Sequence, residues 1–250
     1  MIVRRAGLVL LVSGALAPSF AAAQWPPQKI QNVKVLSPDI SLRSLVDTMA
    51  GFTRALGVRC TYCHVGTEGA DLGTYDFVSD SLSAKRKARE MMRMALAINH
   101  DYLTNVPDRR SPAIVVTCAT CHHGITQPRP LQQVLTIAYE AGGVDSAEAA
   151  YRALRARYYG SAAYDFGEVP LADVAATARA RDKLADAVAL YKFNIEMAPK
   201  SVFALLQAAG AELAAGDTSA AIAHYEKGLE LSPNDPRLRQ ALDGLKKPKP

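Results

Sequence analysis

The sequence predicts a mainly α protein with little regular strand, in which an amino-terminal helical domain precedes an all-α repeat domain. Apolar residues recur at helical spacing along most of the chain. The pattern Cys-x-x-Cys-His occurs twice in the first half and contains all four cysteines. A 34-residue self-similarity runs through the second half. Together these observations predict domains at residues 24–130 and 167–250, joined by a helical linker at residues 131–166.

Residues 1–23 have the pattern of a cleaved signal peptide. A basic start is followed by an apolar stretch of about a dozen residues, shorter than the ~20 residues of a membrane span. The small residues at 21–23 form a cleavage site. We therefore expect cleavage after Ala23, export and a periplasmic location. Because no cysteine lies near this site, a lipid-anchored start is not expected.

The charge balance gives little support to a nucleic-acid partner. The formal net charge of +5 includes Arg4 and Arg5, so removal of the signal peptide lowers it to +3. No nucleic-acid-binding motif accompanies this charge, so nucleic acid is not expected as a partner. After residue 23 no stretch is long and apolar enough to cross a membrane. Membrane association is therefore expected only through a partner.

The first Cys-x-x-Cys-His motif follows a predicted helix over residues 41–56, with Ser41 as a suitable N-cap and Gly57 as a suitable stop. Met49 lies on the apolar stripe of this helix, ~10.5 Å along the axis from its end, which is about the width of a porphyrin. A methionine on an apolar stripe is usually core filler. Directly upstream of this motif, Met49 is also a candidate distal ligand for a haem iron. The stripe consists of Leu42, Leu45, Val46, Met49, Phe52 and Leu56.

The two motifs supply the same side chains, two thiols and one imidazole: Cys60, Cys63 and His64, then Cys118, Cys121 and His122. This spacing is the attachment signature of a c-type haem, in which the thiols bond to the porphyrin and the imidazole binds the iron from the proximal side. Two disulfides, a zinc held by two Cys-x-x-Cys pairs, or a thioredoxin-like site are the alternatives. None of them requires the adjacent histidine. The motifs therefore predict two covalently bound c-type haems.

A second helix is predicted over residues 83–103, after a polar loop and ahead of the second motif. Its basic run at residues 85–87 is expected to form a solvated face. Helical spacing allows Met91 or Met94 as the second distal ligand and disfavours Met92. The order of methionine-bearing helix, turn and motif thus occurs twice. Further upstream, residues 31–36 alternate weakly and are either a short strand or an arm lying on the domain.

Over residues 28–130 the chain resembles the photosynthetic reaction-centre cytochrome c subunit. In that family each haem packs against a preceding helix, which for most haems supplies a methionine as the sixth ligand. The resemblance implies that Met49 pairs with His64, and Met94 with His122. That subunit carries four haems and a lipid-anchoring cysteine, whereas this chain resembles its first half and has motifs for two haems. The chain could therefore transfer electrons in photosynthesis or in respiration. The segments that carry the resemblance are residues 31–36, the Met49 helix, and residues 58–64, 91–99 and 116–124.

The second half predicts helical repeats. Residues 131–159 form two helical stretches that meet near residues 142–143. Farther on, a 34-residue offset matches Ala187 with Ala221, Tyr191 with Tyr225 and Pro199 with Pro233. This is the tetratricopeptide period, with a generic Ala-rich bundle as the alternative. We expect repeats at residues 167–200 and 201–234, a capping helix at 235–245 and a basic tail.

These patterns predict an electron carrier and not an enzyme. Two His/Met-coordinated haems have no open iron position for a substrate, and the helical repeats contribute no catalytic residues. The expected partners are a redox protein as donor, another as acceptor, and a protein docked on the tetratricopeptide-like region. The alternatives are a dihaem oxidoreductase, such as a peroxidase with one open haem, and a docking protein with redox-sensing haems.

Overall fold

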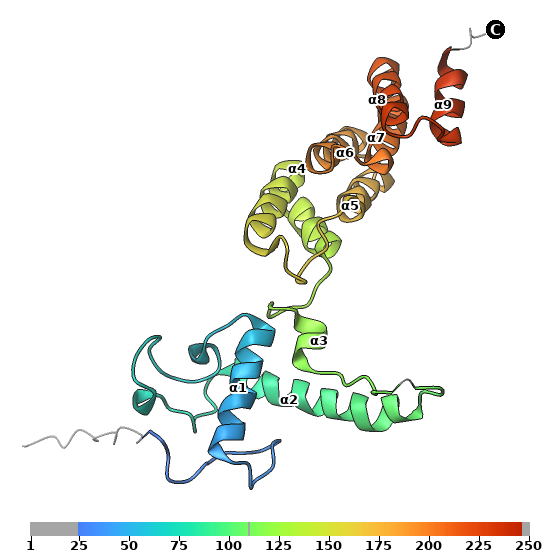
Figure 1. The fold of residues 1–250 in the computed structure, drawn as a ribbon. Helices are drawn as coiled ribbons and strands as arrows, with labels where there is room; N and C mark the ends of the chain where they lie inside the picture. Colours follow the sequence, from blue (N-terminus) through green and yellow to red (C-terminus); the bar gives the residue numbers. More distant parts are fainter. Residues whose placement is uncertain (1–24, 110, 247–250) are drawn as a thin grey trace, which may run out of the picture. The chain divides into compact units, whose positions relative to one another are not determined.

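The computed structural model describes residues 25–109 and 111–246, and within these ranges it contains helices and no strand (Figure 1). An isolated antiparallel bridge joins Val65 and Asp76. The predicted mainly α class is confirmed. The expected signal peptide lies outside the described residues. Among the described helices, none has the length and apolarity of a membrane span.

In chain order the elements are α1 (Leu42–Leu56), η1 (Cys60–Tyr62), η2 (Leu72–Thr74), α2 (Ser83–Ala97), η3 (Ile98–Tyr102), η4 (Leu103–Asn105), α3 (Cys118–His122), α4 (Leu131–Tyr158), α5 (Glu168–Ala180), α6 (Leu184–Met197), α7 (Val202–Ala214), α8 (Thr218–Leu231) and α9 (Pro236–Lys246).

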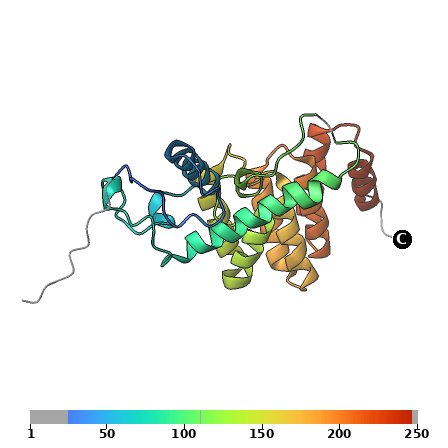
Figure 2. The same cartoon turned by 90° about the horizontal axis from the view of Figure 1, so that it is seen from below.

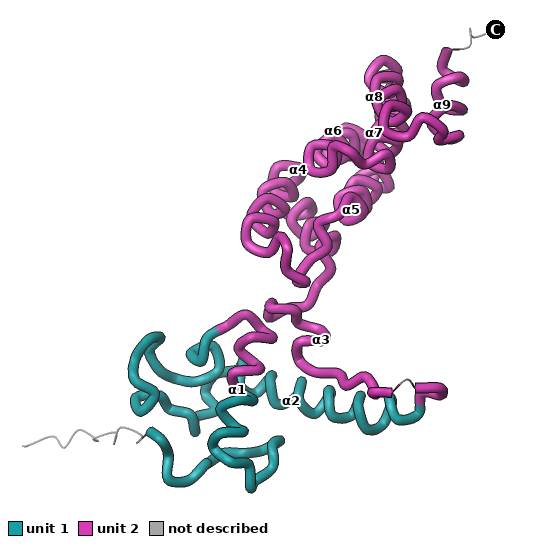
Figure 3. Tube along the Cα trace, viewed as in Figure 1, with its two compact units in different colours: residues 1–48, 59–105 teal, residues 49–58, 106–250 magenta. Residues whose placement is uncertain are grey.

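The chain divides into two compact units, coloured separately in Figure 3. Unit 1 contains residues 1–48 and 59–105, and unit 2 contains residues 49–58 and 106–250. The division runs through α1. The first Cys-x-x-Cys-His motif belongs to unit 1 and the second to unit 2. The domain boundaries expected at residues 130 and 166 stay predictions.

Unit 1 is built from the first turns of α1, from α2 and from the loops between them. Ser41 caps α1 as predicted, since its Oγ accepts a hydrogen bond from the Ser44 backbone at 3.1 Å. The predicted helix at residues 83–103 is regular to Ala97 and continues as the π-helical turn η3. Residues 31–36 form an irregular arm and not a strand. Apolar side chains on the two helices stay widely exposed, including Val46, Met91, Met94 and Leu96.

Unit 2 contains the main hydrophobic core, which lies among α4 to α9. Consecutive helices in this series pack against one another (Figures 1 and 2). The bounds of α7 and α8 are those of α5 and α6 shifted by 34 residues, as the repeat predicts. Two matched positions, Ala187 and Ala221, are fully buried. The break expected within α4 is present, because Gly142 and Gly143 have non-helical backbone angles.

Candidate haem sites

The first motif forms one tight turn. Residues Cys60–Tyr62 are a 3₁₀ helix, and the backbone amides of Cys63 and His64 both donate to the Cys60 carbonyl, at 3.2 and 3.0 Å. Both thiols are free; that of Cys60 is exposed and that of Cys63 half-buried, and burial raises the pKa of Cys63. The turn brings two thiols and one imidazole into a single short segment. This is the arrangement that double attachment to one porphyrin requires.

His64 sits against an aromatic wall. The ring of Phe77 meets the imidazole edge-on at 5.0 Å between centroids, and Tyr75 and Trp25 each lie 5.5 Å from Phe77. Burial, followed by the nearby cations Lys85 and Arg89, lowers the pKa of His64 to about 4. The imidazole is therefore neutral at pH 7. A neutral imidazole has the lone pair that an iron ligand needs.

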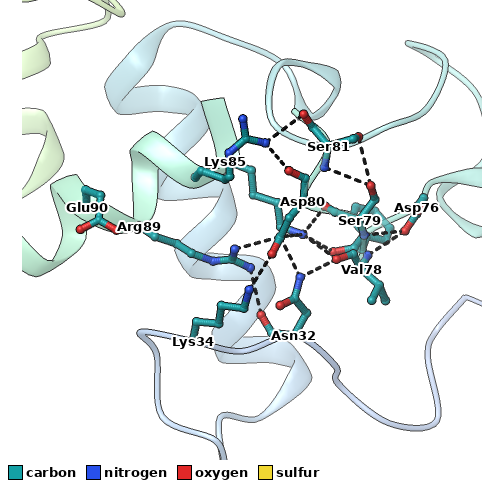
Figure 4. Close-up of polar contacts among 12 residues, drawn as sticks. Asn32, Lys34, Asp76, Val78, Ser79, Asp80, Ser81, Lys85, Arg89 and Glu90 are labelled. Atoms are coloured by element: carbon teal, nitrogen blue, oxygen red, sulfur yellow. Dashed lines mark hydrogen bonds and ion pairs between the residues drawn. The ribbon is translucent and has the colours of Figure 1, made fainter. Parts of the chain in front are cut away.

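A buried lysine, Lys85, ties the loop at residues 77–79 to α2 (Figure 4). Lys85 Nζ donates to the carbonyls of Phe77, Val78 and Ser79 at 2.8, 3.2 and 2.7 Å, and its residue is 9% exposed. The expectation that this basic run is a solvated face is therefore wrong for Lys85. The ammonium group satisfies three loop carbonyls at once, which favours burial over solvation. Lys85 thereby helps to hold the loop that places Phe77 beside His64.

Asp80 gathers the cations around this loop (Figure 4). Its carboxylate lies 2.8 Å from Arg89, 2.7 Å from Lys34 and 3.3 Å from Lys85. Hydrogen bonds from Arg89 and then from Lys34 hold the pKa of Asp80 well below its usual range. Arg89 also donates to the Asn32 carbonyl at 3.1 Å, which fastens the arm at residues 31–36. Three cations surround this one carboxylate, and two of them, Lys85 and Arg89, act on His64 together with the opposing Asp76 carboxylate.

The second motif is the short helix α3. Thr117 caps it in a reciprocal capping box with Thr120. The helix ends at His122, and the following residue, His123, caps it with a left-handed backbone at φ 48°. His122 Nδ1 lies 2.8 Å from the Ile125 carbonyl. Because a carbonyl only accepts, Nδ1 carries the proton and Nε2 holds the lone pair, as in histidines that bind metals.

A glycine pair joins the end of α1 to the turn after α3 within unit 2. The Gly124 amide donates to the Ala55 carbonyl at 2.8 Å. Gly57 ends α1 with φ +65°, and the Val58 amide returns to the Thr53 carbonyl at 3.1 Å, as in a Schellman cap. A Cβ on Gly57 would lie 2.1 Å from the Gly124 carbonyl oxygen. The predicted stop at Gly57 is therefore also a packing requirement.

The methionines lie on the predicted helices. Met49 is half-buried on α1 and falls in unit 2, whereas Met91 and Met94 lie on α2 in unit 1 and are 43% and 47% exposed. Met92 is half-buried. The pairings of Met49 with His64 and of Met94 with His122 stay predictions.

The donor set fits a covalently attached haem. Each motif has two free thiols. His64 is neutral and its buried Nδ1 has no hydrogen-bond partner, whereas the tautomer of His122 is fixed by Ile125. In the described part of the chain, no three His, Cys, Asp or Glu side chains form a group that could hold a bare metal ion. Exposed apolar side chains on α1 and α2 suit the apolar faces of a porphyrin.

Sequence reasoning missed Lys85 and Asp80. Their roles depend on a loop that folds back onto α2, and helical spacing alone cannot report such a contact. The one sequence signal was the acidic Asp80 a short distance before a basic run. The close contact between Gly57 and Gly124 was also missed, although both glycines are visible in the sequence.

Comparison with known proteins finds two family matches. The family described as photosynthetic reaction centre cytochrome C subunit matches residues 14–165, and a tetratricopeptide repeat family matches residues 202–242. The first match extends past the predicted resemblance on both sides, and the second confirms the predicted repeat. Cytochrome c-554 of Chloroflexus aurantiacus is 36% identical over 69 residues, which are 28% of this chain and 14% of that protein. The chain thus matches only a small part of that relative.

Solved structures give only a distant likeness. The chaperone SycD of Yersinia enterocolitica, in complex with a peptide of YopD, is 20% identical with a TM-score of 0.32, and the match covers 46% of this chain and 89% of that one. PcrH from Pseudomonas aeruginosa is 19% identical with the same TM-score of 0.32, over 47% and 89% of the two chains. Likeness at this level says nothing about function. The family match, by contrast, covers more than half of the chain and both Cys-x-x-Cys-His motifs, so the chain belongs to the photosynthetic reaction centre cytochrome c subunit family.

Proposed function

We propose that this chain is a periplasmic electron carrier with two covalently attached c-type haems. One haem is held by Cys60 and Cys63 with His64 as proximal ligand; the other is held by Cys118 and Cys121, with His122 in that role. The duplicated motif carries the proposal. Its support in the structure is the bond between His122 Nδ1 and the Ile125 carbonyl, which leaves Nε2 free for iron.

Family membership gives the coarser statement. The chain is a cytochrome whose family carries covalently bound haem and transfers electrons. The number of haems and the periplasmic location belong to the proposal. The location rests on the signal-peptide pattern of residues 1–23 and on the export that covalent haem attachment entails.

We assign Met49 and Met94 as the distal ligands, with Met91 as the alternative to Met94. The assignment rests on the repeated order of methionine-bearing helix and motif. Methionine ligation raises the reduction potential and, with histidine on the other side, completes six-coordination. No position is then open to a substrate, which favours a carrier over a peroxidase.

The chain's own residues set the conditions for electron transfer. When bound, haem supplies a reversible one-electron couple. Lys85 and the aromatic wall at Phe77 hold His64 neutral and oriented. The positive charge of Lys85 and Arg89 favours the reduced, less positive form of a nearby iron centre. His122 is oriented by its bond to the Ile125 carbonyl, whereas His64 lies near Lys85 and Arg89, so we expect two different potentials.

The partners of this carrier are a redox donor, a redox acceptor and a protein that docks on the tetratricopeptide repeat. The repeat family match at residues 202–242 supports the docking role.

A redox titration of the purified, haem-loaded protein tests the proposal. Two c-type centres with separate midpoints are expected, and neither should bind carbon monoxide rapidly in the reduced state. A fast, stoichiometric spectral change at one haem would instead show an open iron, and the dihaem oxidoreductase would then replace the carrier.

A further inference from the structure

The second repeat carries a hydrogen-bonded polar pair, Glu212 and His224, where the first repeat is apolar. Under the 34-residue shift that relates α5 to α7 and α6 to α8, Glu212 corresponds to Ala178 and His224 to Leu190. Ala178 and Leu190 are fully buried, and so is Glu212. A carboxylate therefore occupies a position that a methyl group fills in the same fold one repeat earlier. Packing alone does not require it.

One oxygen of this carboxylate is satisfied and the other is not. His224 Nδ1 donates to Glu212 Oε2 at 2.7 Å. Oε1 is buried and has no hydrogen-bond partner, and Lys192 Nζ lies 3.5 Å from it. A buried carboxylate oxygen without a donor is costly, and native proteins rarely leave one unmatched. The unmatched atom is an acceptor that lacks a donor.

Glu212 lines a pocket between α6, α7 and α8 with a volume of about 360 Å³. Its walls are largely apolar and its single carboxylate comes from α7. Lys192 is half-exposed at this site, with 52% of its side chain accessible, so its ammonium group is free to move into solvent. The lining residues are Lys192, Ile195, Glu212, Ala220, Ala223 and His224.

We propose that this pocket binds a cationic side chain of a partner polypeptide, a guanidinium or an ammonium group, with Glu212 as the acceptor. The lone pairs of Oε1 require a donor, and a charged donor forms the stronger bond to a carboxylate. Lys192 already places an ammonium group near this oxygen and stands in for the ligand at a distance longer than a good hydrogen bond. Because Lys192 is exposed and is not part of the buried core, we expect a ligand to displace its ammonium group without disturbing the core. The proposal rests on the proposed docking role of the tetratricopeptide repeat and is independent of the number of haems.

Titration of the full-length, haem-loaded protein with Nα-acetyl-arginine amide tests this site. The signals of His224 and Tyr225, followed by NMR, should shift and saturate. The matched neutral compound, Nα-acetyl-citrulline amide, should leave them unchanged. Equal shifts with both compounds, or no saturable shift with arginine, would overturn the proposal.

Two variants give opposite predictions. Glu212→Ala with His224→Leu installs the residues of the first repeat and should therefore fold; it should lose roughly tenfold or more in affinity. Lys192→Met removes the competing cation and should bind the arginine compound more tightly. A purely structural Glu212–His224 pair predicts no change in either variant, and that result would overturn the proposal. If the double variant does not fold, Glu212→Gln keeps the shape, removes the charge and should show the same loss.

Discussion

The Gly124 amide donates a 2.8 Å hydrogen bond to the Ala55 carbonyl, so the last turn of α1 is fastened to the turn that follows the second haem motif. Gly57 makes this approach possible because a side chain there would collide with the Gly124 carbonyl. The end of the helix that precedes the first motif thereby contacts the turn that follows the second motif. Within unit 2, the last turns of α1 help to hold the turn that follows the Cys118–His122 helix.

Gly57→Ala should destabilise the protein by about 1–3 kcal/mol, through a positive φ and a contact that must open. Thermal unfolding of the haem-loaded protein measures this change. Gly51→Ala is the matched control, since Gly51 lies inside the same helix with no atom within 4 Å of an added Cβ. The control should be neutral or stabilising by up to about 1 kcal/mol. Equal effects of both variants would contradict the packing role of Gly57.

Met49→Ala should remove methionine–iron coordination at one haem and leave both covalent attachments intact. The methionine–iron charge-transfer band should fall by about half, because one of two such ligands is lost. Met197→Leu, in α6 of the repeat region, is the control and should leave the band unchanged. A full band in the Met49 variant would show that Met49 is core filler.

Met94→Ala should remove the remaining half of that band when combined with Met49→Ala. Met91→Ala and Met92→Ala, on the same helix α2, serve as controls. Each of them, combined with Met49→Ala, should keep the remaining half of the band. Loss with Met91 would move the ligand to the alternative named above. Loss with Met92 would show that helical spacing misleads at this site.

Lys85→Met should destabilise the protein by about 1–3 kcal/mol, because the carbonyls of residues 77–79 lose their common donor. It should also lower the potential of one haem and leave the other unchanged, since a cation near His64 is removed. Denaturant unfolding and redox titration measure the two effects. Lys87→Met, an exposed lysine on the same helix, is the control. If both haem potentials shift equally in the Lys85 variant, the local role of Lys85 is wrong.

Local patterns in the sequence predicted most of the helices. The stripe that includes Met49 and the 34-residue offset fixed the extent of α1 and of the repeat helices, because burial of one helix face dictates spacing. Contacts between distant segments were beyond such patterns. The sequence predicts that Lys85 is a surface lysine, and only the structure shows the loop that surrounds it. The Glu212–His224 pair is visible in the sequence only when the two repeats are compared position by position.

Intact mass spectrometry of the exported protein tests the central claim most directly. We predict a chain that begins at Gln24 and carries the mass of two haems. Replacing Cys60 and Cys63 by alanine should remove one haem mass, and replacing Cys118 and Cys121 should remove the other. A wild-type protein with one haem or none, or a pair of cysteines whose loss leaves the mass of both haems in place, would contradict the account.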